Sequence, residues 1–159
     1  MRGYRTFTSD LLDDLLERAR ASERKRQHLN LHESFEEPCQ RLFNAMMRDS
    51  YVRPHRHNAS QGPETIIAVR GKLALLLFDD GGTVTAVESF GAEGESGGAG
   101  VEVTPGSWHT IIALSSEAII LELKGGPLDP TAKFPAPWAP EEGTDAAASY
   151  LEELRSEAG

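Results

Sequence analysis

The feature that most constrains this chain is a pair of histidines followed by a glutamate. His55 and His57 are two residues apart, and Glu64 comes after residues 58–63, a run rich in turn-forming residues. Side chains repeat with a period of two along a β-strand, so we expect both imidazoles on one face. The turn-forming run lets the chain reverse and bring Glu64 back beside them.

A distant stretch supplies one more histidine. Pro105 and Gly106 form a turn before Trp108 and His109, and a second hairpin is needed to carry His109 to the same point. A His-x-His pair alone is a weak indication, because two partly exposed loop histidines give the same pattern. Three neutral imidazoles and one carboxylate converging inside a closed sheet, however, bind a divalent transition metal.

The spacing of these residues resembles that of a known superfamily. The first motif is His55, His57, Glu64 and Gly71, and the second, which begins after 28 further residues, is Gly100, Pro105, Gly106 and His109. Together they resemble the two motifs of the cupin superfamily. Thr104 stands where the family usually has proline, and Ala113 stands where many cupins have asparagine. The resemblance implies an all-β, single-domain cupin barrel, which is a double-stranded β-helix or jelly roll.

Flanking segments resemble a narrower family, the WbuC family of cupin-fold metalloproteins, over residues 9–145. They are Asn30-Leu31-His32, Gln40-Arg41-Leu42, residues 51–57, Trp108-His109, Gly126-Pro127 and residues 136–140. Some members occur among genes for surface-polysaccharide synthesis, and the family has no settled reaction. The resemblance implies that His55, His57, Glu64 and His109 are the metal ligands. Cys39 stands where we expect an aliphatic residue, and we expect it to be buried.

Composition excludes several classes of protein. The chain has 159 residues, which suits one domain. Its net charge of −9 argues against a sequence-independent nucleic-acid binder, which needs a basic surface. No apolar run approaches the ~20 residues of a membrane-spanning helix, and no signal peptide is visible, so we expect a cytoplasmic protein. With the single cysteine Cys39, no intrachain disulfide is possible.

Hydrophobic periodicity predicts a barrel with a helix at each end. An amphipathic helix is expected over residues 9–22 and a short final helix from Asp145, with an irregular segment over 27–38. Strands are expected at 39–47, 51–57, 65–70, 73–78, 83–90, 101–103, 108–114 and 118–124. We divide the chain into an N-terminal extension (1–38), the barrel (39–126) and a proline-rich C-terminal extension (127–159), all one folded unit. Phe134 and Trp138 are expected to anchor the last of these to the barrel.

Strand parity suggests which residues contact a substrate. If His55 and His57 face inward, Tyr51 and Arg53 share their face, while Val52 and Arg56 face outward, unless Pro54 bends the strand. The candidate substrate contacts are Arg53, Tyr51 and Arg41, which we expect to bind an anionic group of the substrate, and His32, which we expect near the metal. For Arg41 the alternative is a structural salt bridge with a nearby acid. For His28 and His32 the alternative is an ordinary place in a loop.

Two functions stay open at this point. One is an enzyme, a metal-dependent isomerase or dioxygenase acting on a small polar ligand, with a sugar derivative suggested only by the genes that accompany the WbuC family. The other is a non-catalytic module that binds a ligand or is held together by its metal. The expected cofactor is one divalent transition metal per chain, Fe, Mn, Ni, Cu or Zn, among which the sequence does not choose. We also expect a homodimer, because a small barrel has edge strands to cover.

Overall fold

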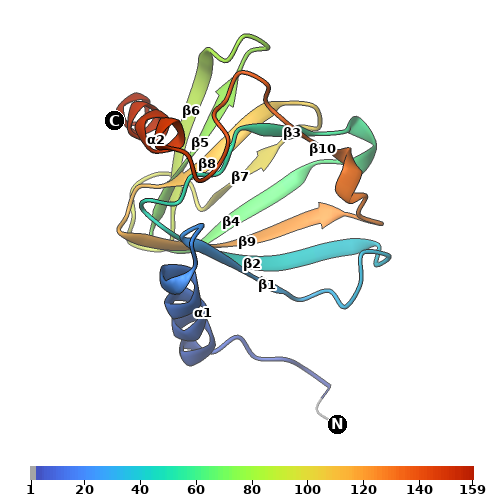
Figure 1. The fold of residues 1–159 in the computed structure, drawn as a ribbon. Coiled ribbons are helices and arrows are strands. Elements are labelled where there is room, and N and C mark those ends of the chain that lie inside the picture. The colour runs from blue at the N-terminus through green and yellow to red at the C-terminus, as the bar shows by residue number, and fades with distance from the viewer. Residues whose placement is uncertain (1–2) are drawn as a thin grey trace.

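Two antiparallel sheets facing each other form the body of the protein (Figure 1). The structure is a computed structural model that describes residues 3–159. The strands are β1 (Arg26–Asn30), β2 (Cys39–Met47), β3 (His55–His57), β4 (Glu64–Arg70), β5 (Lys72–Phe78), β6 (Val84–Gly91), β7 (Gly100–Val103), β8 (Trp108–Ala113), β9 (Glu117–Gly125) and β10 (Lys133–Pro135), and the helices are α1 (Ser9–Ala21) and α2 (Asp145–Glu157). The first sheet has the order β1-β2-β9-β4-β7 and the second the order β10-β3-β8-β5-β6. The predicted all-β barrel with a helix at each end is confirmed.

Two predicted elements differ from the structure. Residues 26–30, most of which we expected to be irregular, form β1, which pairs with β2 at the edge of the first sheet. The predicted strand over residues 51–57 is reduced to β3, since residues 51–54 make no strand pairing. Pro54 accounts for the second difference, because proline lacks the backbone N–H that strand pairing at this position would need. The division of the chain at residues 38 and 126 stays a prediction.

Helix α1 covers the outer face of the first sheet (Figure 1). Thr8 caps it, accepting a hydrogen bond from the backbone N–H of Leu11. Its buried face, at helical spacing, packs against alternate residues of β2 and against β9. The residues in this layer are Leu12, Leu15, Leu16, Ala19, Phe43, Ala45, Met47 and Ile119.

The C-terminal segment and α2 cover the outer face of the second sheet (Figure 1). Trp138 anchors this segment as expected, with its ring centroid 5.0 Å from that of Phe78. Phe134 is 43% exposed, so its predicted role as an anchor is wrong. The prediction that Cys39 is buried is also wrong, because this residue begins β2 at the rim of the barrel and is exposed.

The turn between β4 and β5 shows why the first motif ends in glycine. Gly71 has φ of 70°, a conformation that glycine adopts without steric penalty. A Cβ atom placed there would lie 2.5 Å from the carbonyl oxygen of Glu117. Gly71 therefore permits both the tight turn and the close approach of the segment that enters β9.

The interior of the barrel has two ends of different character. One end, here called the apolar end, is filled by side chains from β2 and from β4 to β9: Met46, Ile66, Leu73, Leu75, Phe90, Val103, Ile111, Ala113, Ala118 and Ile120. The other, the polar end, encloses a cavity of about 240 Å³. Of the helices within residues 3–159, none has the length and hydropathy needed to cross a membrane.

Candidate metal centre

Three histidines converge at the polar end. His55 on β3 and His109 on β8 stand directly opposite each other in an antiparallel pair, so their side chains share a face. His57 lies two residues along β3 and points the same way. One ring nitrogen from each of the three lies within 4.8 Å of the others, which is close enough for a single metal ion. The structure thus brings together the three histidines that the sequence singled out.

Glu64 reaches the same point from the opposite sheet. It is the first residue of β4, and its Oε2 lies 3.4 Å from His57 Nε2 and 3.5 Å from His109 Nε2. The side chain is buried, with 8% of its surface exposed. The fourth predicted ligand is therefore adjacent to two of the three imidazoles, those of His57 and His109.

Backbone carbonyl groups orient two of the imidazoles. His55 Nδ1 lies 3.0 Å from the carbonyl oxygen of Arg53, and His109 Nδ1 lies 2.9 Å from that of Ser107. A proton on each Nδ1 satisfies these contacts and leaves each Nε2 unprotonated, with its lone pair free to bind a metal. In both cases the carbonyl belongs to the residue two positions earlier in the chain.

Two buried atoms at this point lack hydrogen-bond partners within residues 3–159. They are His57 Nε2 and Glu64 Oε2, whose separation is short but whose geometry does not make a hydrogen bond. A buried polar atom without a partner is costly, and it calls for an ion or ordered water. Nitrogen and carboxylate oxygen are suitable donors for a first-row divalent ion. The residues present therefore fit a transition metal.

A buried lysine holds the other side of Glu64. Lys124 Nζ lies 2.6 Å from Glu64 Oε1 and 3.3 Å from an oxygen of Glu122. Burial is the largest single influence and raises the pKa of the Glu64 carboxyl, but the ammonium of Lys124 and the adjacent imidazoles of His109 and His57 together outweigh it and hold this pKa well below its usual range. Burial likewise lowers the pKa of Lys124, and the two carboxylates outweigh it and raise the pKa. Glu64 is thus a carboxylate with one oxygen paired and the other directed at the histidines.

Burial also keeps His55 neutral. Its removal from water lowers its pKa well below the usual range, and the positive charge of Lys133 acts in the same direction. Metal ligation requires the neutral imidazole, so this environment favours the protonation state that binds a metal.

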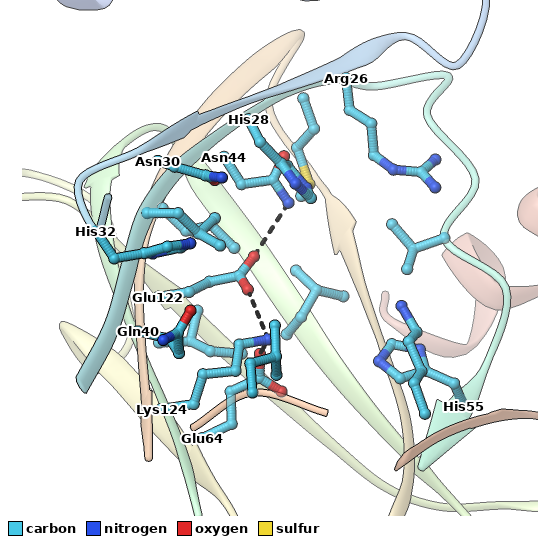
Figure 2. Close-up of a pocket in the computed structure, with 18 of the residues that line it drawn as sticks. Arg26, His28, Asn30, His32, Gln40, Asn44, His55, Glu64, Glu122 and Lys124 are labelled. Carbon is cyan, nitrogen blue, oxygen red and sulfur yellow. Dashed lines mark hydrogen bonds and ion pairs between the residues drawn. The ribbon is translucent and has the colours of Figure 1, made fainter. Parts of the chain in front are cut away.

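The cavity extends from the histidines across to β1, β2 and β9. Figure 2 shows His55 on one side and, facing it, a wall that includes Gln40, Asn44, Glu122 and Lys124. Asn44 Nδ2 donates to Glu122 at 3.1 Å. Arg26, His28, Asn30 and His32 complete the lining on the side of the edge strand β1.

Of the four candidate substrate contacts, one faces this cavity. His32 is buried and lines it, with Nδ1 against the backbone of Arg41. The side chain of Arg41 lies 2.6 Å from Glu37, which is the salt bridge named as its alternative. His28 also lines the cavity, from β1, and not from a loop.

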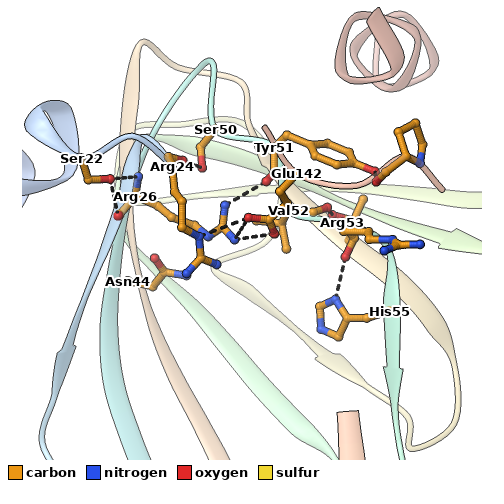
Figure 3. Close-up of polar contacts among 12 residues, drawn as sticks. Ser22, Arg24, Arg26, Asn44, Ser50, Tyr51, Val52, Arg53, His55 and Glu142 are labelled. Carbon is orange, nitrogen blue, oxygen red and sulfur yellow. Dashed lines mark hydrogen bonds and ion pairs between the residues drawn. The ribbon is translucent and has the colours of Figure 1, made fainter. Parts of the chain in front are cut away.

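Tyr51 and Arg53 do not share the face of His55 and His57, so the parity prediction is wrong there. Tyr51 packs under α2 in the outer layer, and its hydroxyl donates to the carbonyl of Pro140 (Figure 3). Arg53 donates to the carbonyl of Ala136 and lines a separate hollow beside His55. Val52, expected to face outward, lines the main cavity. The period of two fails because residues 51–54 are not a strand.

Sequence reasoning missed the polar wall, although alternation carried a signal for it. Gln40 and Asn44 share the parity of Leu42 in β2, and Glu122 and Lys124 share that of Ile120 in β9. Polar side chains at inward positions of otherwise apolar strands indicate a lined cavity. His28 and Asn30 carried no such signal, since β1 was not predicted.

Comparison with solved structures confirms the fold. An uncharacterized double-stranded β-helix protein from Klebsiella pneumoniae aligns with a TM-score of 0.60 and 15% identity, covering 86% of this chain and 97% of that one. Rru_A2000 from Rhodospirillum rubrum, a cupin-2 domain, aligns with 0.54 and 16%, covering 84% and 80%. Oxalate decarboxylase from Bacillus subtilis aligns with 0.52 and 18%, covering 69% of this chain and 27% of that one. The predicted cupin fold is confirmed, whereas the narrower WbuC resemblance stays a prediction.

Sequence comparison places the chain in a family without a described activity. No curated protein matches it. The model of one family matches residues 7–90, which are 84 of the 159 residues and span the stretch from α1 to β6. Since this is more than half of the chain, the protein belongs to the family described as a domain of unknown function, DUF6016.

Proposed function

We propose that this protein is a metal-binding cupin that binds or transforms a small polar ligand. His55, His57, Glu64 and His109 hold one divalent transition metal per chain. The observation that carries the proposal is the convergence of three imidazoles, one nitrogen of each within 4.8 Å of the others, beside a carboxylate oxygen without a partner. Other ionisable groups within residues 3–159 do not form such a three-residue set.

The chain's own residues define what the centre can do. The four ligands come from β3, β4 and β8, so they leave the side facing the cavity open to a ligand. A bound metal supplies Lewis acidity, which polarises an oxygen of that ligand. Lys124 keeps Glu64 ionised, and the backbone carbonyls of Arg53 and Ser107 keep His55 and His109 turned toward the centre.

The small cavity favours a small ligand. Its volume of about 240 Å³ lies below the ~300–1,000 Å³ common for pockets that hold drug-sized molecules. A metal-dependent isomerase or dioxygenase is one candidate, and oxalate decarboxylase, whose matched part shares the fold, is an enzyme by name. The WbuC resemblance favours a sugar-derived ligand from surface-polysaccharide synthesis. The second candidate, a non-catalytic module, uses the same ligands and cavity.

Elemental analysis of the full chain, purified without chelator, tests the metal proposal. We expect about one transition-metal ion per chain, lost on dialysis against a strong chelator and restored by adding the metal back. A chain that holds no transition metal after purification and takes none up would overturn the proposal. Turnover of candidate sugars in air and under nitrogen then separates a dioxygenase, which consumes oxygen, from an isomerase, while binding without turnover indicates the module.

We also propose a homodimer. Each sheet ends in exposed edge strands, β1 and β7 in the first and β10 and β6 in the second. Unpaired edges are commonly covered by another chain. Sedimentation at micromolar concentration should show a species of twice the 17.3 kDa chain mass, and a single species at the chain mass would contradict this.

A further inference from the structure

The wall facing the histidines carries three side chains with hydrogen-bond acceptor atoms. We call it the acceptor wall and define it as Gln40, Asn44 and Glu122, all buried and all lining the cavity. Gln40 and Asn44 come from β2, and Glu122 comes from β9 beside it. They lie across from His55 in Figure 2. These residues are not metal ligands, so their presence in the interior of a barrel needs another explanation.

The orientation of the Gln40 amide is set by its surroundings. Its Nε2 donates to the backbone carbonyl oxygens of Ser34, Phe35 and Glu37, at 3.2, 3.2 and 2.9 Å. Turning the amide over would place its oxygen against three carbonyl oxygens, which is repulsive. Its Oε1 is therefore fixed as an acceptor, and it has no hydrogen-bond partner within residues 3–159.

The Asn44 amide is fixed in the same manner. Its Nδ2 donates to a carboxylate oxygen of Glu122, and the reverse orientation would oppose an oxygen to that carboxylate. Asn44 Oδ1 is thus a second acceptor without a partner among the described residues. The Nε2 of His32 is also unpartnered, but its Nδ1 lies against both the N–H and the carbonyl oxygen of Arg41, so His32 is not counted among the acceptors.

These atoms define what a complementary ligand must offer. Unpaired buried acceptors are satisfied only by donors, so the ligand must carry several N–H or O–H groups on the side away from the histidines. A carboxylate or phosphate there would oppose its oxygens to Gln40 Oε1 and Asn44 Oδ1. An ammonium group would meet the positive charge of Lys124, which is already shared between Glu64 and Glu122.

We propose that the acceptor wall binds the hydroxyl groups of a neutral, polyhydroxylated ligand whose other end faces the histidines. This inference rests on the proposed function, because it names the class of ligand that the metal centre takes. Hydroxyl groups donate without adding charge, and their own lone pairs can accept from the Lys124 ammonium.

Binding to the metal-loaded full chain tests the inference. The probes are neutral polyols and monosaccharides (erythritol, xylitol, myo-inositol, D-glucose, D-galactose and D-mannose), with malonate as the anionic and 1,3-diaminopropane as the cationic comparison. Calorimetry and ligand-observed NMR should show saturable binding of at least one neutral polyhydroxylated probe, tighter than either charged compound. Asn44→Leu removes one acceptor at similar volume and should weaken that binding by about tenfold, as expected for a lost buried hydrogen bond.

The controls separate this inference from the metal proposal. Gln27→Leu alters an amide on the opposite face of β1 and should leave polyol affinity within about twofold, since Gln27 does not line the cavity. If Asn44→Leu fails to fold, Asn44→Ala removes the same oxygen without adding apolar volume. Tightest binding of malonate, no binding of any neutral probe, or unchanged affinity in the Asn44 variants would overturn the inference. Metal content measured on the same samples shows independently whether the metal centre itself stands.

Discussion

The two ends of the barrel interior share the strands β2, β4, β8 and β9 yet have opposite chemistry. Along the inward face of β9, Ala118 and Ile120 lie at the apolar end, and Glu122 and Lys124 lie at the polar end. On β8 the change comes between Ile111 and His109 in the same way. Backbone pairing is continuous across the change, since β2 and β9 pair from Cys39 to Met47. Strand geometry therefore sets which positions face inward, and side-chain identity alone divides core from site.

This difference indicates that the apolar end contributes to stability and the polar end to binding. Burial of apolar surface stabilises the fold roughly in proportion to area, and the apolar end supplies that. Buried ion pairs such as Glu64–Lys124 offset the cost of desolvation without adding much stability. A cavity lined by partnerless polar atoms is destabilising until something fills it. We infer that the polar end is retained for binding, and the following changes test that division.

The largest effect on stability is expected from a substitution that creates a cavity at the apolar end. Phe90 on β6 is fully buried inside the barrel, and Phe90→Ala should lower the free energy of unfolding by about 3–5 kcal/mol. Denaturant titration of the chelated protein measures this change. Metal stoichiometry of the folded variant should stay that of the wild type. Loss of metal from a variant that is still folded would show that the two ends are not separable.

Removing a histidine at the polar end should have the converse effect, weakening metal binding while leaving stability nearly unchanged. His57→Ala removes an imidazole that is 13% exposed, and it should weaken metal affinity by more than ~100-fold, because removing a ligand exceeds the ~10–100-fold effect of removing a residue that only supports one. Stability of the chelated variant should change by less than about 1 kcal/mol, since the apolar end is intact. Competition with a metal-sensitive dye measures the affinity.

His28→Ala serves as the matched control for His57→Ala. Its imidazole lines the same cavity from β1 but does not belong to the three-histidine set, so metal affinity should be unchanged. If instead His57→Ala kept its metal and His28→Ala lost it, the metal would lie toward β1, and His28 and His32 would be its first candidate ligands.

The stability of the chelated protein should fall on acidification, in two stages. Burial holds the pKa of His55 below the unfolded value of 6.5, so as pH falls below about 6.5 the unfolded chain takes up a proton that the folded chain does not. This lowers stability by at most about 1.4 kcal/mol per pH unit. Below about pH 4.5 the unfolded chain also protonates Glu64, whose folded pKa is depressed, and further stability is lost.

Urea titration between pH 4 and 8, after metal removal, measures this dependence. Phe90→Ala should show the same slope with pH at lower absolute stability, because the titrating groups are at the other end of the barrel. In His55→Asn the slope between about pH 6.5 and 5 should decrease, and the part that remains comes from His28, whose pKa burial also lowers. A wild-type profile that is flat over this interval would contradict the environment assigned to His55.

The sequence allowed prediction of most of the site and the fold, and its failures have physical causes. The spacing within two local motifs pointed to His55, His57, Glu64 and His109; the structure brings the three histidines together and places Glu64 beside His57 and His109, while their role as metal ligands stays a prediction. Within β3 the predicted parity held, since His55 and His57 point to the same side. Parity failed at Tyr51 because the strand begins only after Pro54.

The acceptor wall could be predicted less fully. Alternation in β9 placed Glu122 on the inward face, but its hydrogen bond with Asn44 depends on the pairing of β2 with β9, which are far apart in the chain. Strand β1 is short and lies at a sheet edge, and its composition, with Leu29 as the one apolar residue of Arg26–Asn30, does not distinguish it from a loop. Only the three-dimensional structure showed that β1 contributes to the cavity.

The smallest effect is expected from a substitution that keeps the shape of a proposed metal-binding side chain and removes its charge. Glu64→Gln retains an oxygen that can bind a metal but loses the negative charge and places the amide beside Lys124. We expect metal affinity to weaken by about tenfold, less than in His57→Ala, because the donor count is preserved.

Glu122→Gln is the matched control: it removes an equal charge that also pairs with Lys124 but does not approach the histidines. Its metal affinity should stay within about twofold. Equal weakening in the two variants would mean that Glu64 acts through the charge of the polar end and not as a ligand, whereas weakening confined to Glu64→Gln would indicate direct binding of the metal by its Oε2.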